Sequence, residues 1–153
     1  MNYKFSEREI EDILLANLET IEPGLRLLSR QYNFAQKGRI DLLCLDCRKN
    51  LVIIEIKTYA RPGSVYQMEK YPTLLDKRFP NYKKPYRKIL FYLKASYMTR
   101  NLCFLNNIIP FPLKYSALII AKKNLEKTLK DNSEYFLELT YSAYCLHKTL
   151  KYF

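Results

Sequence analysis

The sequence predicts an α/β domain, and three features indicate this class. A capping box opens an amphipathic helix near the N-terminus, three consecutive strand-like runs follow it, and helical and strand-like runs alternate from about residue 63 onward. At 153 residues the chain is long enough to bury about 70% of the surface that it exposes when unfolded. No apolar run approaches the roughly 18 residues of a membrane span, so we expect a soluble protein with a real core.

The first helix is predicted over about residues 7–21. Ser6 and Glu9 form the capping box, in which each side chain satisfies a backbone N–H at the start of the helix. Apolar residues then recur at helical spacing until Pro23 and Gly24 end the run. The N-terminus has no apolar signal-peptide region, so we expect a cytoplasmic, intracellular protein with reduced cysteines.

Three strands are predicted to follow this helix and to form an antiparallel meander. Each run is rich in aliphatic residues and is bounded by turn residues, with DCRKN as the turn before the third. The three strands are predicted over residues 25–34, 38–45 and 50–57.

The rest of the chain is predicted to form two further helical parts and a closing β-α-β unit. Gly63 and Ser64 open a helix containing VYQMEKY, and a basic insertion follows over about residues 77–110, helical from about 84 to 106. The closing unit, over about 115–141, comprises a buried strand at 115–121, a short helix at 123–131 and a last strand at 135–141. We expect a single domain over residues 1–153.

The net charge of +11 is concentrated in the middle of the chain. Residues 77–125 contain eleven Lys or Arg and no acidic residue, whereas the two signs balance on either side. Cations interleaved with aromatic residues are typical of nucleic-acid contacts, because cations neutralise phosphates and rings stack on exposed bases. The alternative is a solvated face with its aromatic residues in the core. The expected contacts are Lys77, Arg78, Lys83, Lys84, Arg87, Lys88 and Lys94.

Charged residues interrupt the two apolar strands of the predicted hairpin. Glu55 and Lys57 alternate onto the same face of the third strand, and Asp41 lies near the start of the second. Because the hairpin is antiparallel, we expect all three side chains to converge at one end of the sheet. Buried, closely spaced carboxylates need a compensating charge.

A divalent cation that prefers oxygen ligands, Mg²⁺ or Mn²⁺, is the simplest source of that charge. Asp41, Glu55 and a backbone carbonyl such as that of Ile56 would bind it, with water in the remaining positions. Lys57 would orient an attacking water or balance the charge that develops on a phosphate. This chemistry is phosphodiester hydrolysis.

The order Asp41, Glu55, Lys57 after an acidic helix resembles the PD-(D/E)xK nuclease superfamily. Gln67 and Tyr71 are similar to the QxxxY motif of its RecB-type members, and residues 6–75 together resemble the nuclease domain of the NucS family of DNA endonucleases. The resemblance implies a restriction-endonuclease-like core, α-β-β-β-α-β, with a mixed central sheet flanked by helices and an inserted basic helical segment. It also implies DNA as the substrate.

Further site residues follow from the resemblance. Glu11 matches the acidic residue that completes the family's site, with Glu7, one turn earlier, as the alternative. Gln67 and Tyr71 would contact the substrate phosphate or the metal shell. Glu22 and Arg39 also match the family pattern, and we count Arg39 among the DNA contacts.

The sequence departs from the superfamily pattern at two prolines. Ile40 replaces the proline that gives the superfamily its name, and Pro72 disfavours helical geometry at Tyr71, so we expect the helix to end or kink there.

Two other functions stay open beside a metal-dependent deoxyribonuclease. The first is a nucleic-acid-binding or assembly protein that keeps the fold without catalysis. The second is a resolvase that acts on branched DNA as a homodimer. The pair Cys44 and Cys47 lacks the second pair or histidine cluster of a zinc site, so we expect ordinary thiols.

Overall fold

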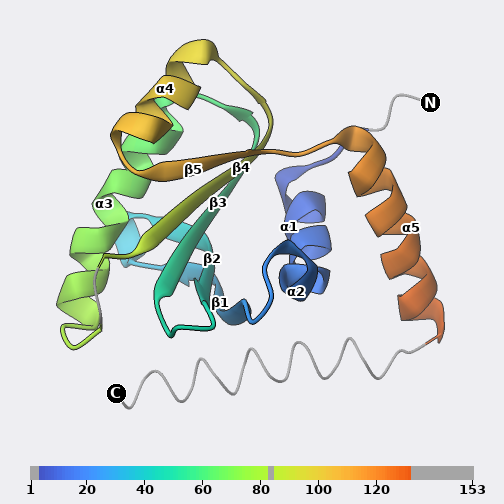
Figure 1. The fold of residues 1–153 in the computed structure, drawn as a ribbon, viewed down its shortest axis with the longest axis horizontal. Helices are drawn as coiled ribbons and strands as arrows, with labels where there is room; N and C mark the ends of the chain where they lie inside the picture. Colours follow the sequence, from blue (N-terminus) through green and yellow to red (C-terminus); the bar gives the residue numbers. More distant parts are fainter. Residues whose placement is uncertain (1–3, 83–84, 132–153) are drawn as a thin grey trace.

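In a computed structural model, which describes residues 4–82 and 85–131, a five-stranded sheet lies between two layers of helices (Figure 1). Helices α3 and α4 cover one face, and α1, α2 and α5 cover the other. This confirms a mixed α/β architecture. The elements are α1 (Glu7–Ala16), α2 (Leu18–Ile21), β1 (Arg26–Asn33), the 3₁₀ helix η1 (Ala35–Lys37), β2 (Arg39–Leu45), β3 (Leu51–Ala60), α3 (Pro62–Arg78), β4 (Arg87–Ala95), α4 (Tyr97–Leu105), β5 (Ile108–Pro112) and α5 (Tyr115–Asp131).

The predicted antiparallel meander is confirmed. The strands lie in the order β1-β2-β3-β4-β5, with antiparallel pairing between β1 and β2 and between β2 and β3. The turn before β3 is held by Asp46, whose carboxylate accepts hydrogen bonds from the backbone N–H groups of Arg48 and Asn50. This turn fixes the register in which Leu42 lies opposite Ile54.

The predicted helix over residues 84–106 is wrong for its first part. Residues Arg87–Ala95 form β4, which pairs parallel with β3, and only Tyr97–Leu105 is helical. The apolar run of β4 is buried from Ile89 to Tyr92, as is typical of an internal parallel strand covered on both faces. The Lys and Arg residues on either side of this apolar run led to the incorrect prediction of a helix.

The predicted buried strand at residues 115–121 is also wrong, because these residues begin α5. Leu118 is buried whereas Ile120 is 61% exposed, so a short apolar run here belongs to a one-sided helix. The strand β5 was not predicted. Pro110 and Pro112 fit its position, since an edge strand tolerates residues that cannot donate to a ladder. The predicted last strand, 135–141, lies outside the described residues.

Helix α3 continues past Pro72 to Arg78, so of the two outcomes expected at Tyr71, an end or a kink of the helix, the end is wrong. Met68, Tyr71 and Leu75 are all fully buried in one core cluster, and this packing holds the helix across the proline. Helix α1 is shorter than predicted, because it ends at Ala16 and a separate turn, α2, follows. No helix in the described ranges is long and apolar enough to cross a membrane.

Candidate active site

The start of β2 and the second half of β3 bring the predicted charged residues together. The register that pairs Leu42 with Ile54 continues to Asp41, whose Oδ2 accepts a hydrogen bond of 2.8 Å from the backbone N–H of Ile56. Lys57 Nζ lies 3.0 Å from Glu55 Oε1. The expected convergence at one end of the sheet is therefore present, between α1 on one side and α3 on the other.

Glu55 is the most deeply buried carboxylate of this group. Its side chain is 1% exposed, and within the described residues its Oε2 has no hydrogen-bond partner. Burial, followed by the nearby charge of Asp41, raises the pKa of Glu55 to about 7. Burial also raises the pKa of Asp41. The two carboxyls therefore carry an electrostatic cost that a bound cation would relieve.

Lys57 contacts carboxylates from two elements. Burial works against its charge, but Glu55, Asp41 and Glu7 together raise the pKa of its ammonium group, which keeps it protonated. Glu7 Oε2, from the first turn of α1, lies 3.9 Å from Lys57 Nζ. Glu7 Oε1 also accepts a hydrogen bond of 3.3 Å from the backbone N–H of Thr58. Helix α1 thus presents the alternative acid, Glu7, directly to the lysine.

Glu11 reaches the same region through β1. Its Oε1 accepts a hydrogen bond from the guanidinium of Arg30, and its Oε2 accepts one of 2.5 Å from the side-chain amide of Gln31. The same amide donates to Asp41 Oδ1 at 3.2 Å. The side-chain amide of Gln31 therefore bridges the carboxylates of Glu11 and Asp41, both of which were predicted from the sequence. Burial raises the pKa of Glu11 despite these partners.

Gln31 was missed in the sequence because nothing marks its position there. It has φ of +52°, a conformation uncommon for residues other than glycine, in a strand whose pairing with β2 is irregular. Its Oε1 is buried and has no hydrogen-bond partner in the described part of the chain. Two buried oxygen atoms in this region, Gln31 Oε1 and Glu55 Oε2, thus lack a hydrogen-bond partner among the described residues and could accept a hydrogen bond or bind a cation.

Gln67 and Tyr71, the pair predicted as a QxxxY motif, contact each other and the start of β2. The amide of Gln67 donates to the hydroxyl of Tyr71 at 2.5 Å, and that hydroxyl donates to the backbone carbonyl of Arg39 at 2.6 Å. Burial, followed by the charge of Glu55, raises the pKa of Tyr71, so its hydroxyl stays protonated. A Cβ at Gly38 would lie 3.2 Å from the Tyr71 ring, which favours glycine there. In this arrangement Tyr71 holds the strand that carries Asp41.

The donor set suits Mg²⁺ or Mn²⁺ when water completes it. Within the described residues no three Asp, Glu, His or Cys side chains lie close enough to bind a metal by themselves. Mg²⁺ commonly uses only one or two carboxylates and keeps several waters, so the pair Asp41 and Glu55 is compatible with such a site. The Oε2 of buried Glu55, which lacks a hydrogen-bond partner among the described residues, is the structural observation that supports this fit.

The predicted nucleic-acid contacts fall into two groups. Arg87 is held by both carboxylate oxygens of Glu22, at 2.6 and 2.7 Å, and by Asp46, whereas Lys88 contacts Glu69. Arg87 and Lys88 therefore form ion pairs with acidic residues of the same chain. The side chains of Arg39, Lys77, Arg78 and Lys94 are exposed, and Lys83 and Lys84 lie outside the described residues.

Comparison with known proteins places this chain in a family. Residues 6–91 match the family model described as the Endonuclease NucS C-terminal domain. The chain is 32% identical over 71 residues to the Endonuclease NucS of Streptomyces avermitilis, covering 46% of this chain and 31% of that protein. It is 34% identical over 84 residues to that of Frankia alni, covering 55% of this chain and 37% of the relative.

A solved structure described as an EndoMS complex with double-stranded DNA shares the fold. It superimposes with a TM-score of 0.60 at 23% identity, over 74% of this chain and 48% of that one. The chain therefore spans about a third of the length of these curated relatives and about half of the solved structure.

Proposed function

This chain belongs to the Endonuclease NucS C-terminal domain family, and from that premise we propose that it is a metal-dependent DNA endonuclease. The proposal assigns Asp41, Glu55 and Lys57 to a PD-(D/E)xK-type site and Gln67 with Tyr71 to its QxxxY motif. One observation carries it. The buried carboxylate of Glu55, one oxygen of which has no hydrogen-bond partner among the described residues, lies beside the half-buried carboxylate of Asp41 and the protonated Lys57.

Asp41 and Glu55 would hold the cation in this proposal, and the backbone carbonyl of Ile56 would be a further oxygen ligand. When bound, Mg²⁺ or Mn²⁺ supplies Lewis acidity to the phosphate and lowers the pKa of a water. The hydrogen bond from the Ile56 N–H fixes one oxygen of Asp41, so the carboxyl is oriented before any ligand arrives.

Lys57 stabilises the negative charge that builds on the phosphate, because its protonated amine needs no rearrangement to do so. Its contact with Glu55 leaves further N–H donors for a water or a phosphate oxygen. Glu7 and Glu11, both on α1, are the candidates for a third acid. Glu11 is already paired with Arg30, whereas Glu7 lies beside Lys57, which favours Glu7 for contact with the reacting water.

DNA cleavage with matched variants tests this function. Labelled single-stranded, double-stranded, flapped and four-way DNA would be incubated with Mg²⁺, Mn²⁺ or EDTA, for the wild type and for Glu55→Gln and Lys57→Ala. We expect metal-dependent products that both substitutions reduce by at least about 100-fold. Glu126→Gln, on the exposed face of α5, is the control and should cut like the wild type.

A non-catalytic DNA-binding protein is the competing function. It predicts that no substrate is cut under any metal condition, while the wild type and the Glu55→Gln variant bind DNA equally. That result would refute the nuclease proposal. Preferential cutting of four-way DNA, with a dimer in solution, would instead favour a homodimeric resolvase.

A further inference from the structure

Gln31 is the residue of β1 that lies across from Asp41, because the preceding residue, Arg30, pairs with Leu42. Its amide nitrogen donates to Oε2 of Glu11 at 2.5 Å and to Oδ1 of Asp41 at 3.2 Å. A primary amide has two N–H groups, so these two contacts use both of them. An amide turned the other way would place its oxygen against two carboxylate oxygens. The neighbours therefore fix which end of the Gln31 amide is the donor.

The oxygen of the same amide has no protein partner. Gln31 Oε1 is buried, and no donor in residues 4–82 and 85–131 contacts it. The other buried side-chain atom without a partner in those residues is Glu55 Oε2. The large majority of buried side-chain polar atoms in folded proteins have a hydrogen-bond partner. These two exceptions therefore indicate a ligand that the described residues do not themselves supply.

Asp41 connects the surroundings of these two oxygens. Its Oδ1 accepts from the amide of Gln31 on β1, and its Oδ2 accepts from the backbone N–H of Ile56 on β3, the residue that follows Glu55. The sheet order β1-β2-β3 places the strand of Asp41 between the other two. A ligand bound at Asp41 thus has Gln31 on one neighbouring strand and Glu55 on the other.

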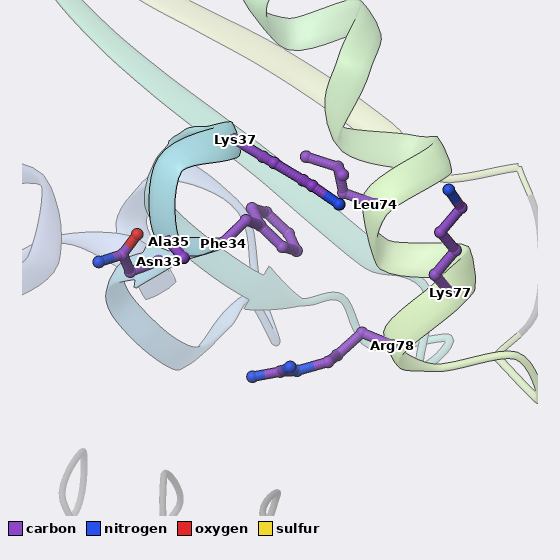
Figure 2. Close-up of a pocket in the computed structure, with 7 residues that line it drawn as sticks. All are labelled: Asn33, Phe34, Ala35, Lys37, Leu74, Lys77 and Arg78. Atoms are coloured by element: carbon purple, nitrogen blue, oxygen red, sulfur yellow. The ribbon is translucent and has the colours of Figure 1, made fainter.

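The pocket that follows Gln31 along the chain does not satisfy the amide oxygen. This pocket, of about 320 Å³, lies between η1 and the C-terminal part of α3, with Asn33 and Lys37 on one side and Leu74 and Lys77 on the other (Figure 2). Gln31 does not line the pocket, so water held there is not the partner of its oxygen.

The two oxygens differ in charge, and this difference assigns them different partners. Glu55 Oε2 belongs to an acid and suits the cation itself, whereas Gln31 Oε1 belongs to a neutral amide. Mg²⁺ keeps several waters when only one or two carboxylates bind it. A water that binds a cation through its oxygen still has O–H groups that donate hydrogen bonds. A buried neutral acceptor is the partner that such a water needs.

We propose that Gln31 Oε1 accepts a hydrogen bond from a water bound to the cation, which makes Gln31 a positioning residue for that water. The inference rests on the proposed function and adds to it a residue outside the set of metal ligands. The N–H groups of Gln31 hold Glu11 and Asp41, while its oxygen orients the water. A neutral amide takes up no proton, so Gln31 orients this water without acting as its base.

Substitutions that remove different ends of the amide separate the water contact from the carboxylate bridge. Gln31→Met removes both the donor and the acceptor at nearly the same size. Gln31→Glu keeps an acceptor, loses the donor and adds repulsion with Glu11 and Asp41. Gln36→Met and Gln36→Glu, at an exposed position of η1, are the matched controls. Urea unfolding in EDTA establishes that each variant is folded, and Gln31→Asn replaces Gln31→Met if the latter is not.

The first readout is NMR relaxation of isotopically labelled water oxygen in the presence of the full chain saturated with Mn²⁺. It measures how many waters are bound to Mn²⁺ and how fast they exchange. We expect Gln31→Met to keep the wild-type number and to speed the exchange of bound water at least about twofold, because a hydrogen bond that retains the water is lost. One additional bound water would make Gln31 a direct ligand, and an unchanged number and rate would remove the contact. Either result would overturn the proposal.

The second readout is kcat and KM for DNA cleavage at saturating Mn²⁺, where differences in metal affinity no longer matter. We expect kcat to fall about 10- to 100-fold in Gln31→Met with KM unchanged, and to fall less in Gln31→Glu, which keeps an acceptor. If the carboxylate bridge were the whole role of Gln31, Gln31→Glu would be the slower variant, because it repels both carboxylates. That order would overturn the proposal.

The two proposals fail in different ways. A wild type that binds no Mn²⁺ or cuts no DNA would refute the proposed function and this inference together. A wild type that binds Mn²⁺ and cuts DNA, with Gln31 variants that match the Gln36 controls in both readouts, would refute the inference alone.

Discussion

The burial of Glu55 makes the stability of the metal-free protein depend on pH in a specific direction. Its pKa rises from an ordinary 4.5 to about 7, because burial and then Asp41 disfavour the charged form. The folded state therefore holds this proton more tightly than the unfolded state does. Its contribution to stability is fully present below pH 4.5 and is lost as pH rises through 7. The change corresponds to about 3 kcal/mol, at about 1.4 kcal/mol per pKa unit.

Glu55→Gln removes this titration while keeping nearly the same shape. Urea unfolding of both proteins in EDTA, from pH 4.5 to pH 8.5, gives the difference in free energy of unfolding at each pH. We expect the variant to gain about 3 kcal/mol relative to the wild type over this range. Groups that do not interact with Glu55 contribute equally to both proteins and cancel in the difference, whereas its neighbours Asp41 and Lys57 are part of the measured effect.

A difference that stays constant with pH would refute the reasoning. It would mean that the Glu55 carboxyl is solvated or fully compensated in the metal-free protein. The proposed driving force for binding a cation would then be absent.

Three other substitutions test separate parts of the account. Gln31→Ala removes the amide that bridges two carboxylates, so we expect Mn²⁺ affinity, measured by calorimetry, to fall about 10- to 100-fold; unchanged affinity would exclude a positioning role. Tyr71→Phe leaves the part-buried backbone carbonyl of Arg39 in β2 without this donor and should cost about 1 kcal/mol in urea unfolding, whereas no loss would show that water replaces the hydroxyl. Arg87→Ala breaks the pair with Glu22 and should lower stability by about 1 kcal/mol without changing the salt dependence of DNA binding; a smaller salt slope would instead make Arg87 a phosphate contact.

The N-terminal half of the fold was predictable because its signals are local. The capping box of Ser6 with Glu9 and the turn at Asp46 are formed by residues within a few positions of one another. The placement of Asp41 beside Glu55 followed from strand alternation and one antiparallel register.

The later elements depend on contacts that are distant in sequence. Whether an apolar run with basic flanks becomes a strand or a helix is decided by its neighbours, and β4 is a strand because it pairs with both β3 and β5. The run at 115–121 had the opposite outcome, because it leaves the sheet and packs one face against α1.

The candidate site could likewise be predicted only in part, because some of its contacts depend on residues that are distant in sequence. Asp41, Glu55 and Lys57 were found from their order in the strands, but the bridge through Gln31 depends on a backbone conformation with positive φ that no residue type announces. The choice between Glu7 and Glu11 needed the actual rotation of α1, which places Glu7 at Lys57 and Glu11 at Arg30.

Binding of Mn²⁺ to the metal-free protein, measured by isothermal titration calorimetry, tests the central claim most directly. The wild type, Asp41→Asn and Glu55→Gln would be titrated at pH 8, with Glu126→Gln as the control for loss of an exposed carboxylate. We expect binding in the wild type and the control, and its loss in both Asp41→Asn and Glu55→Gln. Undiminished binding in those two variants, or none in the wild type, would contradict it.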